Sequence, residues 1–179
     1  GCGVGEGNIL PLIRNALLSG IPLLLDADAL NQMANQKEML SLLHPNVVLT
    51  PHPAEMARLT GEPLEAILDD PIETARKYAA LWNCIVLLKG ATTCISDGTQ
   101  VRLNVSGNPG LAKGGSGDVL SGIITALLAQ GLCAFDAASV GAFLLGASAD
   151  TALELLKERA LIARDVIEVV ERTLDGFFS

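Results

Sequence analysis

The sequence predicts an α/β fold in which helices cover a mainly parallel sheet. Short, continuous apolar runs end abruptly at polar residues, helix-like stretches separate them, and a β-hairpin sequence follows the third run. Continuous apolar runs of this length are typical of parallel strands that are buried on both faces. The chain contains no repeat or composition shift that would mark a boundary, so residues 1–179 are expected to form a single domain.

Each predicted strand ends at residues that can carry chemistry. The first run, Ile21–Leu25, stops at Asp26, and the second, Val47–Leu49, stops before a Thr-Pro pair. The third run, CIVLLKG, stops at Lys89. Ligands of open parallel sheets bind beyond the carboxyl ends of the strands, so the segments DADALN, TPHPAE and KGATT are expected to line the site.

Helices are predicted between these strands. Turn formers bound each helix-like stretch, and Gly61 closes one of them as a C-terminal glycine cap. The expected helices cover residues 8–18, 32–43, 54–59 and 72–81.

The second half of the chain is predicted to be a hairpin followed by helices. Asp97-Gly98 divides two β-like runs in TTCISDGTQVRLNV, and this dipeptide favours a tight hairpin turn. From Gly117 onward an apolar stripe at helical spacing is followed by a long Ala-rich helix and a last helix opened by Asp165. The stripe consists of Val119, Leu120, Ile123, Ile124, Leu127 and Leu128.

Charge and cysteine usage limit the kinds of partner and compartment. The net charge is −8, from 12 basic and 20 acidic residues, which argues against a nucleic-acid or membrane surface and favours a small-molecule ligand. The four cysteines form no CxxC pair and lie in apolar runs, so they are interpreted as reduced packing residues. A cytoplasmic location is expected.

The segment GGSGD is the strongest local indication of a binding site. Its glycines allow backbone N–H groups to converge, and the helix that begins near Gly117 adds its positive dipole end, which together suit a phosphate. Asp118 would repel such an anion unless it acts on the substrate as a base; the alternative is an acid that merely complements the helix dipole. Neither the P-loop pattern nor the dinucleotide pattern G-x-G-x-x-G is present.

Two other polar residues are candidates, each with a simpler alternative. His52 lies between two prolines at a strand end, where it could contact a ligand or be an ordinary surface histidine. Lys89 could bind phosphate or extend from its strand to solvent. His44, before Pro45, is interpreted as structural, and no spacing of metal-ligand residues is recognised.

Taken together, these motifs resemble the ADP/ATP-dependent NAD(P)H-hydrate dehydratases of the ribokinase-like superfamily. The resemblance covers nearly the whole chain and is most specific from Asn108 to Gly122, because sugar and vitamin kinases of the superfamily share mainly a Gly-x-Gly-Asp core. It implies a three-layer α/β/α fold with a mainly parallel sheet and a β-hairpin, from which this chain lacks the N-terminal strands. The matching segments are LDADALN, LTPHPAEMARLTG, VLLKGATTCISDG and GNPGLAKGGSGDVLSGIITALLAQG.

The resemblance implies a cofactor-repair reaction. Water added to the nicotinamide ring of NADH or NADPH would be removed by phosphorylation and phosphate elimination, with ADP or ATP as co-substrate and Mg²⁺ on its phosphates. The enzyme would be a carbon–oxygen lyase that is homo-oligomeric in its full-length form, with room for a fused epimerase domain upstream. Two alternatives stay open: a kinase of a vitamin-precursor alcohol, and a nucleotide-binding regulatory module.

The resemblance also implies roles for individual residues. Asp118 would be the base that contacts the hydrate's hydroxyl, and the first glycine loop, with Cys2 in place of the family's usual proline, would contact the hydrate. The implied substrate-binding residues are Gly3, Gly5, His52, Asn108 and Asp118. The implied nucleotide-binding residues are Lys89, Gly90, Ala91, Thr92, Thr93, Gly114, Gly115, Ser116 and Gly117.

Overall fold

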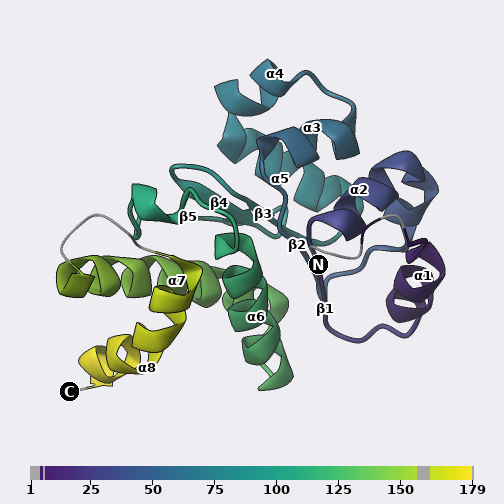
Figure 1. The fold of residues 1–179 in the computed structure, drawn as a ribbon. Coiled ribbons are helices and arrows are strands. Elements are labelled where there is room, and N and C mark those ends of the chain that lie inside the picture. The colour runs from purple at the N-terminus through teal and green to yellow at the C-terminus, as the bar shows by residue number, and fades with distance from the viewer. Residues whose placement is uncertain (1–4, 6, 157–161, 179) are drawn as a thin grey trace.

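The computed structural model of the chain describes residue 5, residues 7–156 and residues 162–178. Within these residues, five strands form one mixed sheet whose order, β1 to β5, follows the chain (Figure 1). The first three strands are parallel, and the last two are antiparallel to their neighbours. The strands are β1 (Leu23–Leu25), β2 (Val47–Leu49), β3 (Ile85–Leu88), β4 (Thr93–Ser96) and β5 (Val101–Asn104).

Side chains alternate between the two faces of the parallel strands, and both faces are buried. Leu49 of β2 and Leu88 of β3 belong to one hydrophobic core, whereas Val48 and Leu87 belong to another on the opposite face. Helices cover both cores, so each strand has no solvent-exposed face and reads as a continuous apolar run. The three-layer α/β/α prediction is confirmed.

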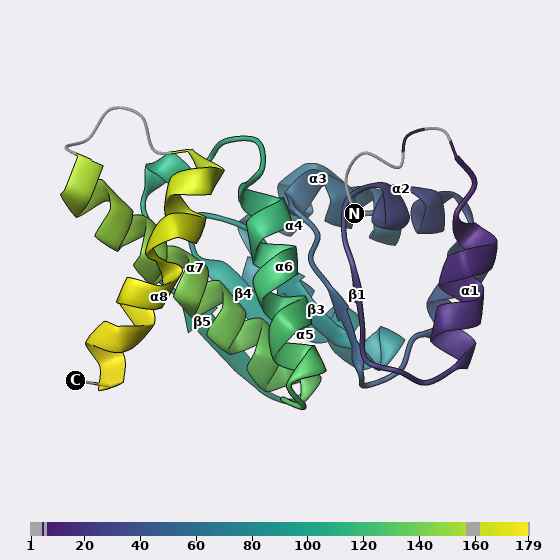
Figure 2. The same cartoon turned by 60° about the horizontal axis from the view of Figure 1, so that its bottom comes forward.

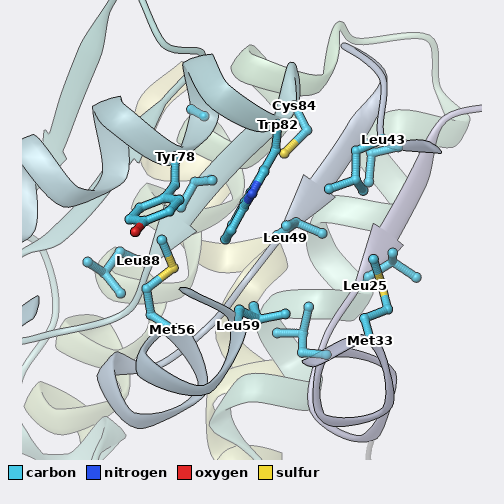
Figure 3. Packing of buried hydrophobic residues seen from close by; sticks show 14 of the residues in the cluster. Leu25, Met33, Leu43, Leu49, Met56, Leu59, Tyr78, Trp82, Cys84 and Leu88 are labelled. Carbon is cyan, nitrogen blue, oxygen red and sulfur yellow. The ribbon is translucent and has the colours of Figure 1, made fainter. Parts of the chain in front are cut away.

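The helices of the first half of the chain cover the face that carries Leu49. In Figure 3 the indole of Trp82 lies in this core together with Tyr78, Met56 and Leu59. The elements of this half are α1 (Leu10–Leu18), α2 (Asp28–Asn35), the 3₁₀ helix η1 (Lys37–Leu42), α3 (Pro53–Thr60), α4 (Leu64–Asp69) and α5 (Pro71–Trp82).

Three helices of the second half cover the face that carries Val48. They are α6 (Ser116–Ala129), α7 (Ala134–Leu156) and α8 (Ala163–Phe178), and a short 3₁₀ helix, η2 (Pro109–Leu111), precedes them. In Figure 2, α7 and α8 lie toward one end of the molecule and α6 lies between α7 and β1. The predicted apolar stripe of α6 is confirmed, because its residues are buried or packed against this core.

The predicted hairpin forms between β4 and β5. Gly98 has a φ of 95°, and a Cβ atom there would lie 2.6 Å from the Cα atom of Ala80 in α5. A side chain would therefore require both an unfavourable backbone conformation and displacement of the helix. Gly61 likewise ends α3 with a φ of 82°, as the glycine-cap prediction requires.

Three expectations need correction. The single helix over residues 32–43 is wrong, because α2 begins at Asp28 and ends before Gln36, whose φ of −134° and ψ of 73° separate it from η1. The first strand begins at Leu23 and not at Ile21. Cys84 and Cys94 are buried as expected, but Cys133 is exposed and is not a packing residue.

Burial raises the pKa of the Cys84 thiol, which keeps this residue protonated at neutral pH. None of the described helices combines the length and apolar character that crossing a membrane would require.

Candidate active site

A buried set of charged and polar side chains lies where the three parallel strands end. Lys89, which follows β3, places its Nζ atom 2.9 Å from Oδ1 of Asp26 and 3.8 Å from Oε2 of Glu55. The hydroxyl of Ser121 on α6 donates to Oδ2 of Asp26 at 3.1 Å. We call Asp26, Glu55, Lys89 and Ser121 the charge network.

The two carboxylates of the charge network are removed from solvent. Asp26 is 4% exposed and Glu55 is 5% exposed, whereas the side chain of Lys89 is 24% exposed. Burying a carboxylate without a partner is costly, so the ammonium between them has a structural role as well as any role in binding. The network joins the ends of β1 and β3 to α3 and α6.

His52 is the N-cap of α3 and forms a capping box with Glu55. Its Nδ1 atom accepts hydrogen bonds from the backbone N–H groups of Ala54 and Glu55, at 3.1 and 3.3 Å. Oε2 of Glu55 in turn accepts from the backbone N–H of His52 at 2.8 Å. Since Nδ1 is an acceptor, Nε2 is the ring nitrogen that carries the hydrogen. This atom lies 3.6 Å from Oε1 of Glu55, and the His52 side chain is 47% exposed.

The glycine run forms the entrance to α6. Gly115 precedes the helix with a φ of 93°, and Ser116 and Gly117 form its first turn. A Cβ atom on Gly117 would lie 3.6 Å from Oδ2 of Asp26 and 3.8 Å from Nζ of Lys89, so this turn borders the charge network. The N–H groups of a first helical turn have no acceptor within the helix and can bind an anion.

Asp118 follows directly in the same turn and is exposed. The predicted base thus lies in the same helical turn as the predicted anion site.

The turn between β3 and β4 contains the KGATT segment. Gly90, Ala91 and Thr92 are exposed, and Thr93 begins β4. The backbone N–H of Lys89 donates to the carbonyl of Pro51 at 2.9 Å, which ties this turn to the segment before His52. The turn is exposed to solvent, whereas the ammonium of Lys89 is directed to Asp26 and Glu55.

Gly5, Gly7 and Ile9 are held against α2. The N–H of Gly5 donates to Oδ2 of Asp28 at 3.2 Å, and Gln32 binds the N–H of Ile9 and the carbonyl of Gly7. Because α2 begins just after Asp26, Gly5 lies at the same edge of the sheet as the charge network. The prediction for Gly3 falls outside the described residues.

Asn108 has its side chain directed to other parts of the protein. Its Nδ2 atom donates to Oδ1 of Asp150 at 2.9 Å, and its Oδ1 accepts from the N–H of Gly110 at 3.0 Å. Asp150 also accepts from the N–H of Gly107 at 2.9 Å. These contacts fix the loop that leads into the glycine run.

Three residues of the site were not singled out from the sequence: Asp26, Glu55 and Ser121. Asp26 and Glu55 do fall in the strand-end segments DADALN and TPHPAE, and a polar residue directly after a buried strand was the available signal. Ser121 carries no such signal, because its partner is 95 residues away in the chain.

The site contains two buried carboxylates whose oxygens are suited to binding a metal ion. Within the residues that the structure describes, no group of three or more His, Cys, Asp or Glu side chains could hold a metal ion. The carboxylates of Asp26 and Glu55 are the hard oxygen ligands that Mg²⁺ prefers, and this ion commonly binds through one or two carboxylates together with substrate phosphates.

Comparisons with known proteins agree with this architecture. A family profile described as NAD(P)H-hydrate dehydratase matches residues 1–172. A bifunctional NAD(P)H-hydrate repair enzyme from Moorella thermoacetica is 47% identical over 86% of the chain and 29% of its own length. An ADP-dependent (S)-NAD(P)H-hydrate dehydratase from Neisseria meningitidis is 44% identical over 93% of the chain and 57% of its own length.

Solved structures show the same fold. The ADP/ATP-dependent NAD(P)H-hydrate dehydratase of Bacillus subtilis, co-crystallised with ATP and Mg²⁺, has a TM-score of 0.75 at 31% identity, covering 86% of this chain and 54% of that one. A ribokinase-like superfamily protein from Enterococcus faecalis has a TM-score of 0.78 at 24% identity, covering 93% and 58%, which supports the fold alone. The chain thus spans less than two thirds of the length of each of these proteins.

Proposed function

Because the chain belongs to the NAD(P)H-hydrate dehydratase family, we propose that it removes water from hydrated NADH or NADPH at the expense of ADP or ATP. The observation that carries the proposal is the position of Asp118 beside the glycine entrance of α6, at the sheet edge where the charge network lies. A base and an anion site in contact suit the transfer of a phosphoryl group to a substrate hydroxyl.

The reaction proceeds in two steps, phosphorylation of the ring hydroxyl and elimination of phosphate. The oxygen of the ring hydroxyl attacks the terminal phosphorus of the nucleotide, and Asp118 accepts the hydroxyl proton. A P–O bond to the substrate forms, and the P–O bond to the remainder of the nucleotide breaks, so the nucleotide leaves with one phosphate fewer. The lone pair of the ring nitrogen then expels the phosphate as the C–O bond breaks, and the adjacent ring carbon loses a proton. Hydroxide is a poor leaving group and phosphate a good one, which explains why a dehydratase consumes a nucleotide.

In this proposal some site residues bind the nucleotide and others bind the hydrate. The N–H groups of the glycine run, Gly114 to Gly117, stabilise charge on the transferring phosphoryl group, and the exposed turn from Lys89 to Thr93 binds the nucleotide. Gly5, the exposed side chain of His52 and Asn108 are assigned to the hydrate, and the contacts of Asn108 also shape the loop before the glycine run.

Mg²⁺ fits this arrangement as an ion carried by the phosphates. Asp26 and Glu55 would hold it through its water shell, because Lys89 already pairs with both carboxylates. When bound, the ion neutralises charge on the phosphates.

The test is to mix the full-length protein with hydrated NADH and either nucleotide, and to follow the absorbance of reduced nicotinamide. The proposal expects reduced nicotinamide and inorganic phosphate in equal amounts. A stable phosphomonoester with no reduced nicotinamide would identify a small-molecule kinase instead. Nucleotide binding without turnover of either kind would identify a regulatory module.

We also propose the broader classification that follows from this activity. The chain would be a single ribokinase-like domain of a cytoplasmic carbon–oxygen lyase. The relative from Moorella thermoacetica is named as bifunctional, which supports a second activity in the whole protein. We propose that this activity is a fused epimerase domain upstream and that the full-length form is a homo-oligomer.

A further inference from the structure

Asp26 is a buried carboxylate whose hydrogen bonds to Lys89 and Ser121 have no part yet in the proposed reaction. Its two oxygens face different elements: Oδ1 accepts from Lys89 at 2.9 Å and Oδ2 accepts from Ser121 at 3.1 Å. Lys89 begins the turn that precedes β4, and Ser121 lies on α6 one helical turn after Gly117. One side chain therefore links the proposed nucleotide turn to the helix that carries the proposed base.

Lys89 is more firmly engaged than a mobile phosphate ligand would be. Within the described part of the chain, its ammonium lies within 4.0 Å of two carboxylates, Asp26 and Glu55, both of which are buried. Moving this ammonium onto a phosphate would leave both carboxylates without it, which is energetically costly. The ammonium of Lys89 thus stabilises the two buried carboxylates, and the turn after Lys89 is the part proposed to bind the nucleotide.

The backbone between Asp26 and Asp28 is strained at Ala27. Ala27 has a φ of 50° and a ψ of −115°, a conformation that favours glycine. Such strain persists only where the surroundings impose it. This turn lets Asp26 face α6 and Lys89, while the next carboxylate, Asp28, binds the N–H of Gly5 in the N-terminal loop.

We propose that Asp26 is a positioning residue for the reaction proposed above. Acting through Lys89 and Ser121, it fixes the position of the nucleotide turn relative to the first turns of α6. The inference rests on the proposed function, because the positioned groups are those assigned there to phosphoryl transfer. Errors of about 1 Å in such groups can cost about a hundredfold in rate.

The test compares Ser121→Ala with Thr125→Ala in the full-length protein. Thr125 is exposed on the same helix, one turn further on, so its variant removes a hydroxyl outside the charge network. We expect Ser121→Ala to lower kcat about tenfold, the order expected for a lost hydrogen bond to a charged group, and Thr125→Ala to leave it unchanged. Ser121→Thr, which keeps the hydroxyl, should restore most of the rate.

Two further measurements separate positioning from a loss of folded protein. Calorimetric titration with nucleotide gives the number of binding sites per chain, and kcat is expressed per site. The positioning role requires that Ser121→Ala bind nucleotide with unchanged stoichiometry and affinity. Asp26→Asn should lower kcat about a hundredfold, and adding Ser121→Ala to it should cause little further loss, since the two residues act as one unit.

Several outcomes would overturn the inference. These are an unchanged kcat per site in Ser121→Ala, fully additive losses in the double variant, or complete recovery of Asp26→Asn by excess Mg²⁺, which would leave holding the ion as the whole role of Asp26. If the wild-type protein forms no reduced nicotinamide at all, the proposed function itself fails. Active wild-type protein with unaffected variants contradicts only the role of Asp26.

Discussion

His52 and Glu55 cap one another: the N–H of His52 donates to Oε2 of Glu55 at 2.8 Å, and Nδ1 of His52 accepts from the N–H of Glu55 at 3.3 Å. This reciprocal pair makes His52 part of the helix start as well as of the proposed substrate surface. Because Glu55 also lies 3.8 Å from the ammonium of Lys89, the cap is continuous with the charge network.

The two roles of His52 can be separated by substitution. His52→Ala removes the cap and should lower the free energy of unfolding by about 1 kcal/mol. His52→Asn keeps a good N-cap and should retain that stability. Both variants should raise the KM for the hydrate, because both lose the Nε2 donor; denaturant unfolding and steady-state kinetics measure the two effects. Normal hydrate KM in both variants would leave His52 with a capping role alone.

Asp118→Asn tests the proposed base. The amide keeps the shape of the side chain but cannot accept the hydroxyl proton, so turnover should fall about a hundredfold or more. Nucleotide affinity should change little, because the first-turn N–H groups of α6 are unaltered. Formation of reduced nicotinamide and calorimetric nucleotide binding measure the two quantities, and a variant that turns over at the wild-type rate would rule out the base assignment.

Gly115→Ala tests the conformation of the helix entrance. At a φ of 93°, alanine should cost about 1–2 kcal/mol, and its Cβ atom would lie 3.1 Å from that of Ala163 on α8. We expect weaker nucleotide binding and lower stability. The matched control is Gly122→Ala in the same helix, where a Cβ atom would meet no neighbour within 4 Å and should stabilise the protein by up to about 1 kcal/mol. Equal effects of the two substitutions would contradict this explanation.

Glu62 gives the protein a component of stability that depends on pH. Hydrogen bonds from Lys77, at 2.6 Å, and from Tyr78, at 2.7 Å, lower the pKa of Glu62 below its ordinary value of 4.5. A carboxyl whose pKa is lower in the folded state stabilises the protein above 4.5, and this contribution is lost as the pH falls through the folded-state pKa.

The expected result is a difference in Tm between the wild type and Glu62→Gln that is constant near neutral pH and shrinks as the pH falls below 4.5. Glu65→Gln, which removes an exposed carboxylate from α4, is the control for a general change in charge. Thermal melts of the three proteins across this pH range measure the effect. A difference that persists unchanged at low pH would show that the ionised form of Glu62 is not what stabilises the fold.

The fold was largely predictable because its signals are local. Buried parallel strands read as apolar runs, and Gly98 and Gly61 mark turns where a side chain would not be tolerated. The expected helix over residues 32–43 was wrong for the opposite reason. Nothing local predicts the break at Gln36, whose backbone leaves the helical region while residues on either side still pack into one core.

The candidate site was predictable only in part. The anion site and Asp118 are adjacent in the chain, so one segment revealed both. The charge network joins residues 63 and 95 positions apart, and no pattern within a single segment can show that Asp26, Lys89 and Ser121 meet. Asn108 could be recognised as special from its place before the glycine run, but its partner Asp150 lies on a distant helix.

The order of the strands has a consequence for how the molecule is built during synthesis. In the described part of the chain, each strand after β1 pairs with the strand before it, so these strands can be added one at a time to an edge already formed. Asp26, in contrast, is hydrogen-bonded to Ser121 on α6, which lies 95 residues later in the chain. These five strands can thus pair before α6 docks, whereas the charge network is complete only once α6 has docked.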